Sequence, residues 1–157
     1  MVEIIKLDPN SSLDQDENLK KLKELCQLEK VVMTYGHFSS IHPGHIRYLQ
    51  NARDYGNKLV VTLIGDGKAG SAKNYQFTCR ERSQSLALLN LCDYIIELVD
   101  KELQKVVNII HPERIIFGTD YKLSKEKEII DTIKVAKEIK THISYDSGEI
   151  IYASTDL

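Results

Sequence analysis

The sequence predicts an α/β fold in which an open, mostly parallel β-sheet carries helices on both of its faces. Two observations predict it: the alternation of apolar and helical segments along the chain, and the continuous apolar character of the short runs. Short, nearly continuous apolar runs alternate with segments of helical periodicity along the chain. Runs of this kind are typical of strands that are buried on both faces of a parallel sheet. A chain of 157 residues is long enough to bury a sizeable core as one domain.

The N-terminal part of the chain contains a helical pattern. We expect residues 12–30 to form an amphipathic helix, with Ser12 as its N-cap. The apolar residues at helical spacing are Leu19, Leu22, Leu25 and Cys26. Residues 1–30 are therefore expected to form an N-terminal segment ahead of a main domain at residues 31–157.

The first strand and helix of the main domain are strongly marked. The run KVVMTYG, residues 30–36, predicts a short buried strand that ends in glycine. The segment PGHIRYLQNARDYG predicts a helix, because Pro43 suits the first helical position and Gly56 suits the C′ position after its end. The run KLVVTLIG, residues 58–65, predicts a second buried strand.

The alternation continues to the end of the chain. A polar, glycine-containing loop is expected from Asp66 to about Thr78. Further helices are expected at residues 80–91, at 100–110 with Asp100 as N-cap, and at 124–139 with Ser124 as N-cap. Further strands are expected at residues 93–98, 113–118 and 141–146.

Ligands of parallel sheets bind beyond the carboxyl ends of the strands. This rule places four loops on one rim of the sheet. They are residues 36–45, 65–78, 118–122 and 152–156.

Two histidines stand three residues apart at the expected start of the second helix. With Pro43 at the first helical position, His42 lies near the N-cap and His45 near N3, on the same face of the helix. Both rings converge where unpaired backbone N–H groups and the helix dipole attract an anion. Gly36 and Gly44 allow the backbone to approach a phosphate closely. The pattern favours a phosphate site over a structural histidine pair.

Composition excludes several classes of protein. The net charge is −2 and the basic residues form no stripe, so we expect no nucleic-acid partner. No apolar run is long enough to cross a membrane and no signal peptide is apparent, so we expect a cytoplasmic protein without a membrane partner. The three cysteines are scattered and form no C-x-x-C pair, so neither a zinc site nor a disulfide framework is expected.

The segment GHFSSIHPGH resembles the opening of the cytidylyltransferase-like nucleotidyltransferases, whose pattern is G-x-F-D-x-x-H-x-G-H at the end of the first strand. Three later segments resemble the same family in the same order. RERSQSLALLNLCDYIIEL resembles its E-x-R helix and V-D strand, IIFGTDYK the G-G-D-Y segment of ADP-heptose synthases, and YASTDL the closing I-S-S-T segment. The resemblance covers residues 31–157 and implies a Rossmann-like fold of the HxGH type, close to glycerol-3-phosphate cytidylyltransferases and to the nucleotidyltransferase domain of ADP-heptose synthases.

The resemblance implies a reaction. A nucleoside triphosphate and a phosphorylated sugar or polyol would give a nucleoside-diphosphate-linked product and pyrophosphate. The attacking phosphate oxygen is largely ionised at neutral pH, since the second pKa of a phosphate monoester is about 6, so no general base is required. CTP is the first expected donor and ATP the close alternative, with Mg²⁺ as cofactor and a homodimer as a possible assembly.

The resemblance also implies the site residues. Its catalytic residues are His42, His45 and Lys73, a loop lysine for which Lys68 is the alternative. Arg82 is expected at the nucleotide, with a surface ion pair to Glu81 as the alternative. The nucleotide-binding residues are expected to be Tyr35, Gly36, His37, Phe38, Gly44, Arg82, Asp120, Tyr121, Ser154 and Thr155. No resident metal ligand is expected.

The chain departs from the family pattern at two positions. Ser39 stands where the family has an aspartate after the phenylalanine, and Asp156 stands where an arginine often follows the closing S-T. The chain also stops at Leu157, so a truncated domain or part of a longer protein is expected. Two alternatives stay open: a catalytically impaired nucleotide-binding or regulatory domain, which Ser39 motivates, and a coenzyme-type adenylyltransferase.

Overall fold

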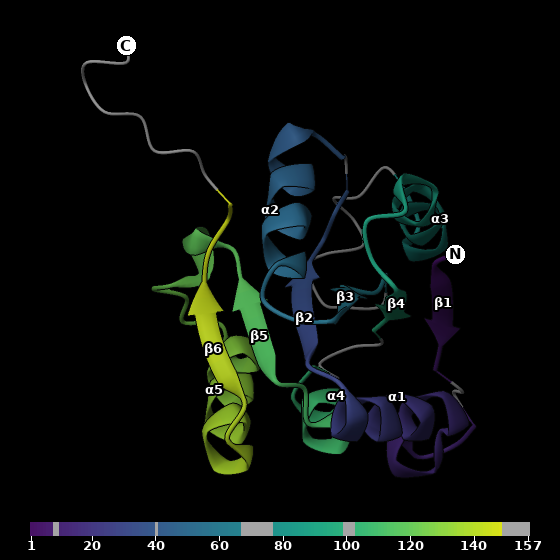
Figure 1. Ribbon diagram of the computed structural model, residues 1–157, viewed down its shortest axis with the longest axis vertical. Helices are drawn as coiled ribbons and strands as arrows, with labels where there is room; N and C mark the ends of the chain where they lie inside the picture. The colour runs from purple at the N-terminus through teal and green to yellow at the C-terminus, as the bar shows by residue number, and fades with distance from the viewer. Residues whose placement is uncertain (8–9, 40, 67–76, 99–102, 149–157) are drawn as a thin grey trace.

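A six-stranded, all-parallel sheet forms the centre of the molecule, with strand order β1-β4-β3-β2-β5-β6 (Figure 1). The computed structural model describes residues 1–7, 10–39, 41–66, 77–98 and 103–148. The strands are β1 Glu3–Lys6, β2 Val31–Gly36, β3 Lys58–Leu63, β4 Tyr94–Glu97, β5 Arg114–Phe117 and β6 His142–Tyr145. The predicted α/β fold with an open parallel sheet is confirmed.

Helices cover both faces of this sheet, as predicted. They are α1 Glu17–Leu28, α2 Pro43–Arg53, α3 Cys79–Leu89, α4 Leu103–Ile110 and α5 Lys127–Ile139. Helices α1, α4 and α5 pack together on one face, and α2 and α3 lie on the other (Figure 1). Short 3₁₀ turns at Leu13–Gln15 and Thr119–Tyr121 complete the described elements.

The core consists of two apolar layers, one on each face of the sheet. Along β2, Val31 and Met33 belong to the layer under α1, α4 and α5, whereas Val32 belongs to the layer under α2 and α3. All three side chains are fully buried. Burial of one such side chain contributes roughly 1.5–3 kcal/mol. Because every position of a central strand is buried on one face or the other, the strand appears in the sequence as a continuous apolar run.

The N-terminal segment folds differently from the prediction. Residues Glu3–Lys6 form an edge strand, which was not predicted, and it pairs with β4. Helix α1 begins at Glu17, and its N-cap is Asp16 rather than Ser12. The Asp16 carboxylate accepts the backbone N–H groups of Asn18 and Leu19 at 2.9 and 3.1 Å. Ser12 precedes the first 3₁₀ turn and makes no capping hydrogen bond with its side chain.

The predicted cap of α5 was also wrong. The helix begins at Lys127, with Glu126 at the N-cap position. Ser124 lies two residues earlier, where its hydroxyl accepts the N–H of Glu126 at 3.2 Å. The hydroxyl therefore stabilises the turn that leads into the helix. Asp100, the predicted cap of the fourth helix, lies outside the described residues.

Gly56 has a different role from the one predicted. Helix α2 ends at Arg53, and its C-cap Asp54 keeps a right-handed conformation with φ −73°. Gly56 does not have the positive φ of a C′ glycine. A Cβ atom at Gly56 would lie 2.6 Å from the Lys30 carbonyl oxygen and 2.7 Å from a methyl carbon of Val32. Glycine is therefore required for close packing against the start of β2.

Among the described residues, no helix has both the length and the apolar character that a membrane crossing would need.

Candidate functional site

A cavity of about 600 Å³ opens at the carboxyl ends of β2 and β5. Its walls come from the loop after β2, the first turns of α2, the turn after β5 and a residue beyond β6. The lining residues are Tyr35, Gly36, His37, Phe38, Ser39, His42, Gly44, His45, Arg47, Tyr48, Gly118, Asp120, Tyr121 and Ser147. Two of the four predicted rim segments, residues 36–45 and 118–122, thus meet at one site. Most of the third and all of the fourth, which hold Lys68, Lys73, Ser154, Thr155 and Asp156, lie outside the described residues.

His42 and His45 cap the amino end of α2 together. His42 is the N-cap, and its Nδ1 accepts the N–H of Gly44 at 3.0 Å. The Nδ1 of His45, at N3, accepts the N–H of His42 at 3.3 Å. The ring centroids are 4.0 Å apart. Because each Nδ1 acts as an acceptor, the proton of a neutral ring is on Nε2.

Gly44 makes this arrangement possible. A Cβ atom at this position would lie 2.7 Å from Cε1 and 3.0 Å from Nδ1 of His42. A side chain there would displace the His42 ring from the helix terminus. The glycine of the histidine motif therefore serves the placement of a neighbouring side chain, and not only the approach of backbone to a ligand.

The ring of Phe38 packs against the histidine pair. The residue is 3% exposed. The centroid of its ring lies 5.1 Å from that of His45, and the ring stacks on Tyr48 at 6.3 Å between centroids. The backbone of Phe38 is left-handed, with φ 51°, a conformation that costs a residue other than glycine on the order of 1 kcal/mol. A Cβ atom at Gly36 would lie 2.9 Å from the Phe38 ring, so the glycine leaves space for this ring.

Two buried tyrosines join the wall of the cavity to the sheet. The Tyr48 hydroxyl donates to the Ile116 carbonyl oxygen and accepts the Tyr35 N–H at 3.4 Å. The Tyr35 hydroxyl donates to the Glu128 carboxylate at 3.2 Å, away from the histidines. Burial raises the pKa of both phenols well above the usual value, so both stay protonated at neutral pH.

The turn after β5 supplies the opposite wall. Asp120 and Tyr121 lie in its 3₁₀ turn, and the Tyr121 ring contacts Tyr35 edge-on at 5.8 Å. Burial, together with the nearby Glu126 and Asp120, raises the pKa of Tyr121 to about 12. A Cβ atom at Gly118 would lie 2.8 Å from Oδ1 of Asp120, so glycine at this position lets the carboxylate fold back over the turn.

Three lining residues lie outside both the predicted rim segments and the predicted site residues: Arg47, Tyr48 and Ser147. Arg47 comes four residues after Pro43, on the same side of the first turns of α2, and this spacing was a signal that could have identified it. Ser147 joins the end of β6 to the turn after β5, because its hydroxyl accepts the Thr119 N–H at 2.8 Å. Residues this far apart in sequence give no local signal of such a contact.

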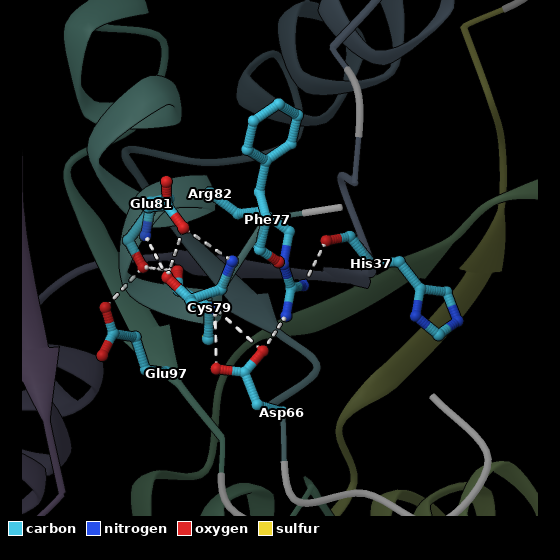
Figure 2. Close-up of polar contacts among 9 residues, drawn as sticks. His37, Asp66, Phe77, Cys79, Glu81, Arg82 and Glu97 are labelled. Atoms are coloured by element: carbon cyan, nitrogen blue, oxygen red, sulfur yellow. Dashed lines mark hydrogen bonds and ion pairs between the residues drawn. The ribbon is translucent and has the colours of Figure 1, made fainter. Parts of the chain in front are cut away.

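Arg82 does not line this cavity. It is 2% exposed and lies under the loop after β2 (Figure 2). Its Nη1 donates to the His37 carbonyl oxygen at 2.6 Å, its Nη2 to Asp66 at 3.2 Å and its Nε to the Phe77 carbonyl oxygen at 3.3 Å. Glu81, the alternative partner considered from the sequence, instead forms a capping box with Thr78 at the start of α3.

The cavity wall carries three imidazoles, one fixed positive charge and one carboxylate. His37, His42, His45 and Arg47 line it together with the carboxylate of Asp120. The described part of the chain holds no group of three or more side chains that could bind a metal ion. Mg²⁺ is commonly held by one or two carboxylates together with substrate phosphates and water. Asp120 is the carboxylate that the described cavity wall offers to an ion of this kind.

Comparison with known proteins finds similarity over most of the chain. A family model described as cytidylyltransferase-like matches residues 33–156. The bifunctional protein HldE of Psychromonas ingrahamii is 34% identical over 144 residues, which are 87% of this chain and 30% of that protein. HldE of Histophilus somni is 33% identical over 142 residues, which are 85% of this chain and 29% of that protein. The chain thus spans about a third of the length of these relatives.

Solved structures show the same fold. A lipopolysaccharide core biosynthesis protein from Thermoplasma volcanium has a TM-score of 0.58 and 27% sequence identity, and the match covers 75% of this chain and 93% of that one. The pantoate-beta-alanine ligase of Francisella tularensis has a TM-score of 0.56 at 12% identity, with 92% of this chain and 66% of that one covered. The second likeness concerns the fold alone.

Proposed function

The chain belongs to the cytidylyltransferase-like family, and from this premise we propose that it transfers CMP from CTP, or AMP from ATP, to a phosphorylated sugar or polyol. Family membership supports nucleotidyl transfer in general. The observation that carries the proposal for this chain is the capped histidine pair. His42 and His45 use Nδ1 to accept backbone N–H groups at the amino end of α2, and both line the cavity.

In the proposed reaction an oxygen of the acceptor's phosphate attacks the α-phosphorus of the triphosphate. A new P–O bond forms there, the bond from the α-phosphorus to the bridging oxygen breaks, and pyrophosphate leaves with the electron pair. The attacking oxygen is already ionised, so the protein needs no general base. Its task is to position the phosphates and to stabilise the charge that develops on them.

The chain supplies this stabilisation from one end of one helix. The Nε2–H groups of His42 and His45 would donate to oxygens of the α- and β-phosphates, and the helix dipole adds its positive end. Arg47, one turn further along α2, would add a fixed positive charge at the cavity wall. Mg²⁺ would enter with the triphosphate as part of the substrate and would neutralise its phosphate oxygens. Lys73 and the closing Ser154–Thr155 pair would complete the phosphate contacts.

Two observations support a phosphorylated sugar as the acceptor. The segment IIFGTDYK, which forms β5 and the turn at the cavity, resembles the corresponding segment of ADP-heptose synthases. The Thermoplasma neighbour is a lipopolysaccharide core biosynthesis protein. The same segment supports ATP as the close alternative to CTP, which is the first proposed donor.

The test has two stages. Thermal shift with Mg²⁺ and CTP, ATP, GTP or UTP identifies the nucleotide, and pyrophosphate release is then measured against a panel of phosphorylated heptoses, hexoses and polyols. We expect CTP or ATP to stabilise the protein and one acceptor to support turnover. Absence of stabilisation by all four nucleotides would contradict the proposal.

A second candidate function follows from Ser39. This residue lines the cavity where the family pattern has an aspartate, so the site lacks one carboxylate. A nucleotide-binding domain without turnover would show stabilisation by a nucleotide but no pyrophosphate release with any acceptor. Restoration of turnover in Ser39→Asp would identify the missing carboxylate as the cause.

A further inference from the structure

The contacts of Arg82 leave no part of its guanidinium directed at the cavity. All three of its nitrogen positions donate to protein oxygens, on the His37 carbonyl, Asp66 and the Phe77 carbonyl. Its side chain is 1% exposed. A charge buried this deeply is retained at a cost in desolvation, and it is compensated here by the Asp66 carboxylate. Arg82 therefore acts on the site through the groups that it holds.

Arg82 holds the peptide bond between His37 and Phe38. A trans peptide is planar, and its C=O and N–H point in opposite directions. Arg82 holds the His37 carbonyl toward α3, as Figure 2 shows, while the His37 imidazole points the other way. The Phe38 N–H is consequently directed away from α3 and from Arg82.

Two further observations support this orientation. Within the described part of the chain, the Phe38 N–H has no protein acceptor. The residue is nevertheless 3% exposed and lines the cavity, so its donor would be satisfied by a group bound there. The left-handed backbone of Phe38, with φ 51°, persists only where surrounding contacts hold it. The Phe38 ring contacts Tyr48 and His45, and the peptide bond that precedes Phe38 is held by Arg82 through the His37 carbonyl oxygen.

We propose that Arg82 is a positioning residue that locks the His37–Phe38 peptide so that the Phe38 N–H donates to the α-phosphate beside His42 and His45. The inference rests on the proposed function and deepens it. Asp66, which follows β3, holds Arg82 in place. Its carboxylate pairs with Arg82, and each of its oxygens accepts the Cys79 N–H at 2.9 Å. One buried cation thereby connects the loop after β2 to Asp66 and the start of α3.

The chain offers a direct readout of this donor. It contains three phenylalanines, and the dipeptide His-Phe occurs once, at His37–Phe38. Protein labelled with ¹³C-carbonyl histidine and ¹⁵N-phenylalanine gives one amide signal in a carbonyl-filtered spectrum, that of Phe38. The ¹⁵N signal of Phe117, which is buried in β5, reports the fold in the same sample.

The experiment compares the parent chain with Arg82→Ala, Arg82→Lys and the control Arg80→Ala, before and after addition of Mg²⁺ with CTP or ATP. Arg80 is a matched control because it sits on the same helix turn and pairs with Glu97 at 3.2 Å outside the cavity. In the parent and in Arg80→Ala we expect a downfield shift of the Phe38 amide. In both Arg82 variants the shift should be lost while the Phe117 signal stays in place.

Kinetics on the same proteins separates positioning from general support of the fold. Loss of one preorganised donor should lower kcat about 10- to 100-fold in Arg82→Ala, with KM for the nucleotide changed less than about threefold. Added methylguanidinium should restore part of kcat. A Phe38 amide that shifts as in the parent, with kcat within about twofold, would overturn the inference and leave the proposed function standing. A parent Phe38 amide that responds to neither nucleotide, although thermal shift shows that one of them binds, would also overturn the inference alone. Absence of thermal stabilisation by every nucleotide would overturn the proposed function as well.

Discussion

The hydroxyl of Tyr48 donates to the backbone carbonyl of Ile116, and this contact fixes helix α2, which carries the histidine pair, to the end of strand β5, which leads into the turn that holds Asp120 and Tyr121. The two walls of the cavity are therefore connected through one buried side chain. The same hydroxyl accepts the Tyr35 N–H from β2 at 3.4 Å.

Tyr48→Phe should destabilise the fold. The substitution keeps the ring but leaves the Ile116 carbonyl and the Tyr35 N–H without this partner, at a cost of about 1–3 kcal/mol in the free energy of unfolding. Urea unfolding measures the difference. The control is Tyr55→Phe, because the Tyr55 hydroxyl bonds Asp146 at the surface and its loss should matter less. Equal stability of Tyr48→Phe and the parent would contradict the assigned role.

Gly44→Ala should lower activity without a matching loss of stability. The new methyl group would meet the His42 ring at 2.7 Å and displace it from the helix terminus. Alanine is otherwise favoured over glycine in a helix by about 1 kcal/mol. We expect pyrophosphate release to fall at least roughly tenfold, as expected for a displaced donor, while the free energy of unfolding stays within about 1 kcal/mol of the parent.

Gly56→Ala should show the reverse pattern and is the matched control. Its methyl group would meet the backbone oxygen of Lys30 at 2.6 Å, far from the histidines. Backbone cannot yield as a side chain can, so we expect a loss of about 1–3 kcal/mol in stability. The nucleotide-dependent turnover of the folded fraction should be retained. If both alanine variants lost activity and stability together, the distinction between the two glycines would be wrong.

Acid should weaken the packing of the segment after β6 against α2. The Gly148 N–H, at 2.9 Å, holds the pKa of Asp146 below its ordinary value, and the Tyr55 hydroxyl at 2.8 Å contributes. A lowered pKa in the folded state stabilises the protein fully above the unfolded value of about 3.9, and this contribution is lost as the pH falls through the folded value. Below about pH 4 we therefore expect the stability of the parent to fall more steeply than that of Asp146→Asn. Parallel stability curves for the two proteins in this range would show that the carboxylate contributes nothing.

The sheet was predictable from the sequence because strands that are buried on both faces are apolar at nearly every position. Residues of β2 and β3 are apolar at nearly every position, since alternate side chains pack into two different layers. The edge strand β1, EIIK, was missed because it precedes the alternation of strands and helices from which the other strands were predicted. The caps at Ser12 and Ser124 were misplaced because serines and carboxylates stand close together there, and local sequence does not decide which one caps.

The part of the site that lies at the carboxyl ends of the strands was predictable from the sequence. The carboxyl ends of adjacent parallel strands meet, so the histidine loop and the Asp120 turn were expected together, and the structure brings them to one cavity. Tyr48 and Ser147 line it through contacts with residues distant in sequence, which no local pattern reveals. Arg82 was assigned from its motif to the nucleotide, whereas its burial against the His37 carbonyl is visible only in three dimensions.

The central claim is that His42 and His45 hold the triphosphate for transfer. Its most direct test is single-turnover pyrophosphate release by His45→Ala, beside the control His142→Ala, whose side chain is exposed on β6 and outside the cavity. We predict a fall of about 10²- to 10³-fold in the rate for His45→Ala, as for the loss of one preorganised donor, and parental rates for the control. A His45→Ala rate within about threefold of the parent, with the protein folded, would contradict the account.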